Sequence, residues 1–137
     1  MTTTLLIEQE LDTRWGDMDA LGHINHATYL TYCETVRVAW FEQLSGRIGE
    51  SAGAGPVLAQ VRCDYRLPVV HPARLRVSMH GHVPGRSSVR TDYEIRDAEQ
   101  PERLYATSTA IVVWVDYQDG KSRPLPPSIR DVLPATD

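Results

Sequence analysis

The sequence predicts an α+β fold in which five antiparallel strands form one sheet wrapped around one long helix. Apolar residues recur at helical spacing in a single long segment, at about residues 26–44. Alternation of apolar and polar residues marks five other segments, and mostly short connections join the last four of them. Because only one helix is available to cover such a sheet, wrapping the sheet around it is the economical arrangement.

The predicted strands follow from this alternation. The first covers residues 5–15, with Ile7, Leu11 and Trp15 on the parity expected to face the core. The other four are expected at about 57–67, 74–80, 87–96 and 104–116. The centre of the last strand is apolar on both parities, as in a strand buried on both faces, and a second copy of the chain would supply the missing cover. A helical turn is expected at 128–133 in the closing segment.

The predicted helix carries an apolar stripe that steps by four, three, four and four residues. Its members are Tyr29, Cys33, Val36, Trp40 and Leu44. Asn25 is expected to cap the helix, Ser45-Gly46 to end it, and a glycine-rich loop to follow over residues 45–55. Glu34 can pair with Arg37 one turn later.

Length and composition limit the classes of protein. The 137 residues suit one domain, which we expect to span residues 1–137. A net charge of −4 and the lack of a Lys/Arg-rich tract argue against a nucleic-acid partner. With no basic n-region and no apolar run of membrane-spanning length, we expect a cytoplasmic protein without membrane insertion. Cys33 and Cys63 lie on apolar parities and are expected to be small core residues.

Residues that can carry chemistry gather just ahead of the helix. Asp17, Asp19, His23 and His26 occur within ten residues of one another. A helix start offers unpaired backbone N–H groups and a partial positive charge, which suit a developing oxyanion. A carboxylate beside it can act as nucleophile or general base. The arrangement predicts an acyl-transfer site.

Two other interpretations of the same run stay open. Asp-x-Asp before a helix is typical of turn and capping chemistry, and a lone histidine is often structural. Asp17, Asp19, His23 and His26 are also the residue types of a metal-dependent hydrolase. Nothing completes a zinc signature such as His-Glu-x-x-His, and we therefore expect no metal.

The element order, with Asp-x-Asp-x-x-Gly-His-Ile-Asn before the helix, resembles the hotdog-fold acyl-CoA thioesterases of the 4-hydroxybenzoyl-CoA thioesterase type. The likeness spans most of the chain. It includes Tyr29, Glu34 with Arg37, and the segments 64–68, 85–88, 115–116 and 123–126. The resemblance implies a hotdog fold and hydrolysis of an acyl-CoA thioester to a free acid and CoA. No bound cofactor is implied, because CoA would arrive as the substrate.

The resemblance also assigns residues position by position. Asp19 matches the family's catalytic aspartate, and Asp17 matches a neighbouring acid that is more often structural. The backbone N–H of His26 matches the oxyanion donor. The His26 side chain resembles the histidine found in the branch associated with the Tol-Pal system. In the acyl-transfer hypothesis it would orient the carboxylate or a water. His23 and Asn25 belong to the signature of a broader branch, so the acyl group stays open.

The resemblance further implies a homodimer or a dimer of dimers, with active sites at the dimer interface. The CoA arm would run near the third and fourth strands, which makes Arg86, Ser87 and Ser88 candidate CoA contacts and Arg123 a weaker one. His71-Pro72 stands where relatives often have a Gly-Asp turn, so no role is carried over to it. A hotdog domain that binds acyl-CoA without turnover is the alternative; it would need the same groove but not Asp19.

Overall fold

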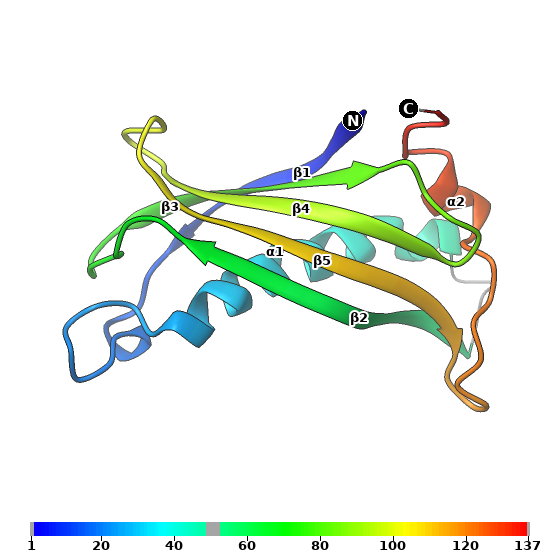
Figure 1. Ribbon diagram of the computed structural model, residues 1–137, viewed down its shortest axis with the longest axis horizontal. Coiled ribbons are helices and arrows are strands. Elements are labelled where there is room, and N and C mark those ends of the chain that lie inside the picture. The colour runs from blue at the N-terminus through cyan, green and yellow to red at the C-terminus, as the bar shows by residue number, and fades with distance from the viewer. Residues whose placement is uncertain (1, 49–52, 137) are drawn as a thin grey trace.

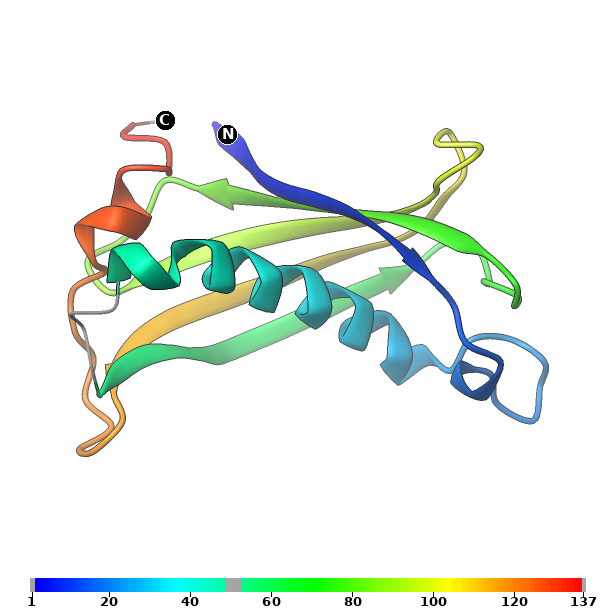
Figure 2. The same cartoon turned by 180° about the vertical axis from the view of Figure 1, so that it is seen from behind.

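The computed structural model describes residues 2–48 and 53–136. Its elements are β1 (Thr3–Asp12), η1 (Trp15–Asp17), α1 (His26–Ile48), β2 (Ala54–Tyr65), β3 (Arg74–His82), β4 (Ser88–Asp97), β5 (Leu104–Asp116) and α2 (Pro127–Arg130). The strands form one antiparallel sheet in the order β1-β3-β4-β5-β2, and α1 lies along one face of it (Figure 1). Figure 2 shows the same helix in front of the curved sheet. The expected fold class is confirmed.

The core lies between α1 and the inner face of the sheet. The whole helical stripe from Tyr29 to Leu44 is buried, as predicted. It packs on inward-facing sheet residues, which include Val77, Met79, Tyr93, Ile95, Ala110 and Val112. Each large apolar side chain buried in this way contributes about 1.5–3 kcal/mol, so α1 is held firmly and its first residue is fixed at one end of the sheet.

The first strand and the helix differ from expectation at their ends. Trp15, expected on the buried face of a strand, begins the 3-10 turn η1 and is 77% exposed. The strand has already ended at Asp12, and the N–H of Thr13 donates to the Ala73 carbonyl at 3.0 Å, which draws the chain away from the sheet.

The helix runs through Ser45-Gly46 to Ile48. A glycine inside a helix costs only about 1 kcal/mol, which does not end a helix anchored by buried Trp40 and Leu44. Of the loop expected over 45–55, residues 49–52 lie outside the described residues, and 54–55 belong to β2.

The second strand has an interrupted alternation. Its register with β5 shifts between Leu58 and Gln60, so Leu58 and Val61 face the helix side and Val57 does not. As an edge strand β2 leaves Leu58 42% and Val61 40% exposed. In β5 the outward residues Ile111 and Val113 are half-buried within one chain, and the cover that a second copy is expected to supply to this face stays a prediction.

The two cysteines occupy interior positions, one wholly and one partly buried. Cys33 is 2% exposed in the core, where burial raises the pKa of its thiol to about 12, and Cys63 is half-buried. Both are free thiols, as expected of small interior residues. Among the described residues no helix is long and apolar enough to cross a membrane.

Candidate active site

The site loop, residues 13–25, connects β1 to α1 and is folded back on itself. A bridge joins Met18 to Ile24, and the Asp19 N–H donates to the His23 carbonyl at 3.0 Å. At the turn Gly22 has φ +83°, a conformation that suits glycine, and its N–H donates to the Asp19 carbonyl at 3.0 Å. The loop therefore holds a defined shape immediately before the helix.

Asp17 anchors this loop. It is 6% exposed, and its carboxylate accepts hydrogen bonds from the Arg14 backbone N–H (3.0 Å), the Arg14 Nε (3.2 Å) and the Tyr32 hydroxyl (2.8 Å). Burial alone would raise its pKa, but the hydrogen bonds from Tyr32 and Arg14 outweigh burial and hold the pKa of Asp17 below its ordinary value. Both carboxylate oxygens are thus engaged in tying η1 to α1.

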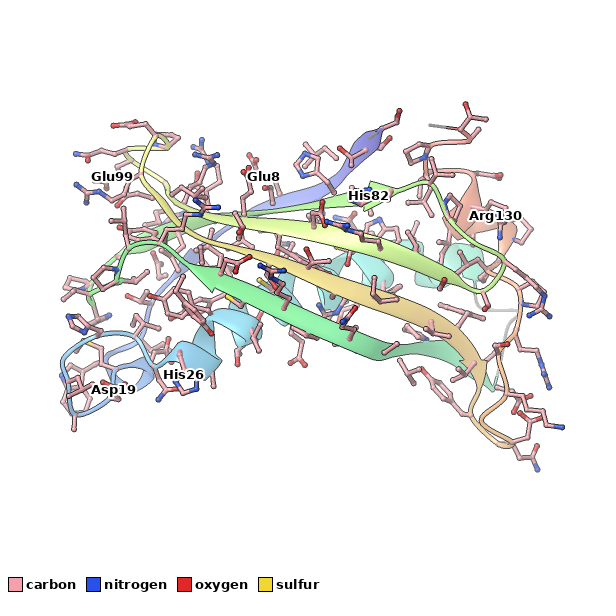
Figure 3. The ribbon with its side chains drawn as sticks, in the orientation of Figure 1. Glu8, Asp19, His26, His82, Glu99 and Arg130 are labelled. Atoms are coloured by element: carbon pink, nitrogen blue, oxygen red, sulfur yellow. The ribbon has the colours of Figure 1, made fainter. Side chains whose placement is uncertain are left out.

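Asp19 lies in a different environment. It is half-buried, and its Oδ1 accepts the Leu21 N–H at 2.9 Å. Within the described part of the chain no donor contacts its second oxygen. Figure 3 shows Asp19 on the site loop at the same end of the molecule as His26. This carboxylate keeps an oxygen that can react.

His26 is the first residue of α1. Asn25 caps the helix as expected: its Oδ1 accepts the Ala27 N–H and its carbonyl accepts the Thr28 N–H, both at 2.9 Å. In residues 2–48 and 53–136 the His26 N–H has no protein acceptor. The side chains of His26 and His23 are exposed.

The strand β2 and the chain that follows it fix the helix start from the other side. The Tyr65 hydroxyl donates to the His26 carbonyl at 2.7 Å, and the Tyr65 ring meets the Tyr29 ring edge-on at 4.9 Å between centroids. The Tyr29 hydroxyl accepts the Val69 N–H at 3.1 Å, and the Val69 carbonyl accepts the Ile24 N–H at 2.8 Å. These contacts hold the site loop against the end of β2.

Sequence reasoning missed this supporting role of Tyr32 and Tyr65. Tyr32 reaches a carboxylate 15 residues earlier, and Tyr65 reaches a carbonyl 39 residues earlier. The only signal in the sequence is that Tyr32 lies one turn from Tyr29 and Val36 of the helical stripe, while Tyr65 lies on the apolar parity of its strand, and each carries a hydroxyl that can form a hydrogen bond.

The candidate CoA contacts lie at the other end of the sheet. Arg86 is exposed between β3 and β4, with its Nη1 3.5 Å from the Ser122 Oγ. Arg130 on α2 donates to the carbonyls of Gly85 (2.8 Å) and Arg86 (3.0 Å), and Figure 3 shows Arg130 far from Asp19. The nine residues of β3 separate the two ends by about 30 Å.

Ser87, Ser88 and Arg123 lie at this same end. The carbonyls of both serines accept hydrogen bonds within the sheet and hairpin, at 2.7 Å from the Trp114 N–H and 2.8 Å from the Gly85 N–H. The Arg123 guanidinium contacts carboxylates of Asp116 at 3.2 Å and Asp119 at 3.1 Å. Arg86 therefore carries the less neutralised positive charge of the two arginines.

The metal alternative finds no matching geometry. No group of three or more His, Cys, Asp and Glu side chains able to hold a metal ion occurs in the described ranges. Both oxygens of Asp17 are already engaged, and the imidazoles of His23 and His26 are exposed.

Comparison with known proteins defines the family. The sequence model of one protein family, the thioesterase-like superfamily, matches residues 13–133 of this chain. The chain is 27% identical over 127 residues to the 1,4-dihydroxy-2-naphthoyl-CoA hydrolase of Synechococcus elongatus, covering 90% of this chain and 91% of the relative.

Comparison with solved structures points to the same family. The PA2801 protein of Pseudomonas aeruginosa, assigned as a thioesterase, superposes with a TM-score of 0.87 at 40% identity, covering 93% of this chain and 98% of that one. A thioesterase from Thermus thermophilus, in complex with coenzyme A and Zn, superposes with a TM-score of 0.78 at 28% identity, covering 94% of this chain and 92% of that one. The chain therefore belongs to the thioesterase-like superfamily, and it is a thioester hydrolase.

Proposed function

We propose that the protein hydrolyses acyl-CoA thioesters, with Asp19 as the reacting carboxylate and the start of α1 as the oxyanion site. One observation carries the proposal: the site loop holds a carboxylate with an unused oxygen beside a helix start whose first N–H has no acceptor in the described chain. The names of relatives support the substrate class, since one hydrolyses a CoA thioester and another was solved with coenzyme A.

The helix start would stabilise the negative charge that develops on the thioester oxygen. Asn25 already occupies the Ala27 and Thr28 N–H groups, which leaves the His26 N–H as the available donor of the first turn. The 23-residue helix adds a partial positive charge at this end. Losing one such donor typically lowers the rate by about 100- to 1,000-fold.

Asp19 can act by two routes. As nucleophile, it attacks the carbonyl carbon, the C–S bond breaks, the CoA thiolate takes a proton, and water then hydrolyses the mixed anhydride. As general base, it takes a proton from water while the hydroxide adds to the carbonyl, and that proton passes to the departing thiolate. The His26 imidazole would orient the carboxylate or the water. A single turnover in heavy-oxygen water separates the routes, because only the first labels Asp19.

The distance between the two ends of the sheet supports a site that two chains share. Within one chain a CoA phosphate bound at Arg86 would lie about 30 Å from a thioester bound at His26. This separation favours Arg86 of a second chain as the CoA contact. Antiparallel pairing of β2 with β2 of a second copy would set the Asp19 end of one sheet beside the Arg86 end of the other. We propose such a homodimer, alone or within a dimer of dimers, with each site taking Asp19 and His26 from one chain and Arg86 from its partner.

The exposed side chains of β2 support this interface. β2 is a 12-residue edge strand with Val57, Leu58 and Val61 each 40–42% exposed, and Val38 on the adjacent face of α1 is 46% exposed. Long apolar edge strands pair with another chain unless they are protected. The other edge, β1, instead carries glutamates paired to arginines of β3.

No bound cofactor belongs to this proposal, and we place the reaction in the cytoplasm, which suits the free thiols of Cys33 and Cys63. A screen of short, long, branched and aryl acyl-CoAs, with detection of the free thiol, tests the function. Hydrolysis that Asp19→Asn abolishes supports it. Acyl-CoA binding without thiol release from any of them would assign the chain to the non-catalytic alternative.

A further inference from the structure

Arg37 places a guanidinium inside the layer between α1 and the sheet. The residue is 8% exposed, its Nη1 donates to the Tyr93 hydroxyl oxygen at 3.1 Å, and its guanidinium carbon lies 5.7 Å from the centre of the Tyr93 ring. A guanidinium has five N–H donors, and no carboxylate of the described chain contacts this one. A buried cation is strongly unfavourable unless an anion pairs with it.

A groove between α1 and β2 leads to this guanidinium. It consists of two adjoining hollows of about 170 and 250 Å³, and Glu34, Arg37 and Leu58 line both of them. Most of the other walls are apolar, among them Leu30, Cys33, Val61, Val38 and Phe41. Charged groups that meet in such surroundings interact more strongly than in water.

Glu34 stands at the rim of the same groove. It is exposed, and the pairing with Arg37 expected from their helical spacing is absent from the contacts of the described residues. The chain therefore presents, side by side, a buried cation and an exposed anion that do not satisfy each other.

The position of this pair along β2 shows what would satisfy it. β2 runs from Ala54 to Tyr65, so full-length antiparallel pairing with a second copy sets the two-fold axis between residues 59 and 60. Leu58 and Val61, which line the groove, stand on either side of that point. Groups next to a two-fold axis lie next to their own counterparts, so each groove faces the other chain's groove.

We propose that Glu34 of the partner subunit pairs with Arg37 across this axis, twice in each dimer. The inference rests on the proposed β2 dimer and adds what closes it: two buried, reciprocal ion pairs surrounded by the apolar side chains of Leu58, Val61 and Val38. A second copy is the occupant that supplies both the anion for the cation and the apolar cover for the groove.

Charge reversal tests the pairing on the full-length protein. Glu34→Arg and Arg37→Glu each set four like charges around the axis, so each should raise the dimer dissociation constant by about 100-fold or more, measured by sedimentation equilibrium. An equimolar mixture of the two variants should form heterodimers within about tenfold of the wild-type affinity, because every introduced charge then faces its opposite. Glu42→Arg is the matched control, since Glu42 is exposed on α1 and lines neither hollow.

Neutral variants cover the case in which Arg37→Glu does not fold. Glu34→Gln, Arg37→Gln and their combination form a double-mutant cycle, and the combined loss of dimer affinity should be no larger than that of the worse single variant. Additive losses, or a mixture that stays monomeric beside a dimeric wild type, would overturn the pairing and leave the dimer standing. An unchanged dimer affinity in Arg37→Gln with a raised KM would assign Arg37 to substrate instead. A monomeric wild type would contradict the proposed dimer itself.

Discussion

Asp17 and Asp19 stand two residues apart in the site loop, and their surroundings differ in almost every respect. Asp17 is 6% exposed and accepts three hydrogen bonds from Arg14 and Tyr32, whereas Asp19 is half-buried and accepts one from the Leu21 N–H. A carboxylate with both oxygens engaged stabilises a conformation. A carboxylate with an unused oxygen is available to attack or to accept a proton. The comparison indicates that one acid holds the loop and the other reacts.

Replacing Asp19 should give the largest effect on activity. Asp19→Asn keeps the size of the side chain and its acceptor for the Leu21 N–H but removes both the nucleophile and the base. Turnover of acyl-CoA should fall by about 100-fold or more, while the melting temperature changes little. Steady-state thiol release and thermal unfolding measure the two quantities, and near wild-type turnover would move the chain to the binding-domain alternative.

Asp17→Asn should lower stability more than turnover, the opposite of Asp19→Asn. An amide cannot accept all of the hydrogen bonds that Arg14 and Tyr32 donate, so the free energy of unfolding should drop by about 1–3 kcal/mol. Turnover should fall far less than in Asp19→Asn. Urea unfolding provides the measurement, with Asp12→Asn as the exposed control. An Asp17→Asn variant that is as stable as the wild type but inactive would instead assign the reacting role to Asp17.

Arg86→Ala should act on binding alone. Loss of a charged contact to a CoA phosphate should raise KM for acyl-CoA by about tenfold or more and leave kcat near wild type. A truncated acyl-pantetheine substrate, which lacks those phosphates, should be hydrolysed normally. Equal losses on both substrates would point to a damaged hairpin, and Arg103→Ala, in the hairpin at the opposite end, provides the control.

The smallest effect concerns pH. Because the pKa of Asp17 is lowered in the folded protein, its ionised form contributes stability at pH values above the ordinary pKa of about 4, and this contribution is lost as the pH falls through the lowered value. The stability gap between the wild type and Asp17→Asn should therefore be constant near neutral pH and shrink below about pH 4. Urea titrations across this range measure it, and a gap that widened on acidification would contradict the assignment.

The sequence alone was enough to predict the features that follow from local spacing. The four-three-four-four stripe predicted the buried face of α1, and placing Asn25 at its start located Asp19 and His26 at the helix N-terminus. Contacts between distant segments were out of reach, because no spacing in the sequence relates Tyr65 to the His26 carbonyl.

Two features of the fold differ from expectation because they too depend on contacts between distant segments. The alternation in β2 could not reveal the register shift at Leu58, which depends on how β5 pairs with it. Helical spacing indicated that Glu34 can pair with Arg37, yet the sheet curves around α1 and covers Arg37, so that its guanidinium contacts Tyr93 instead.

The account depends most on one claim, that a working site combines Asp19 of one chain with Arg86 of its partner. Subunit complementation between Asp19→Asn and Arg86→Ala tests it, with hydrolysis measured at an acyl-CoA concentration well below KM. In a heterodimer a shared site collects both substitutions in one place and leaves the second site intact.

Random exchange of subunits should then restore about a quarter of the wild-type rate, since half of the dimers are mixed and each has one intact site. If Asp19 and Arg86 act within the same chain, every site carries one substitution, and the mixture gives only the mean of the two separate variants. That mean, obtained with subunit exchange verified, would contradict the shared site.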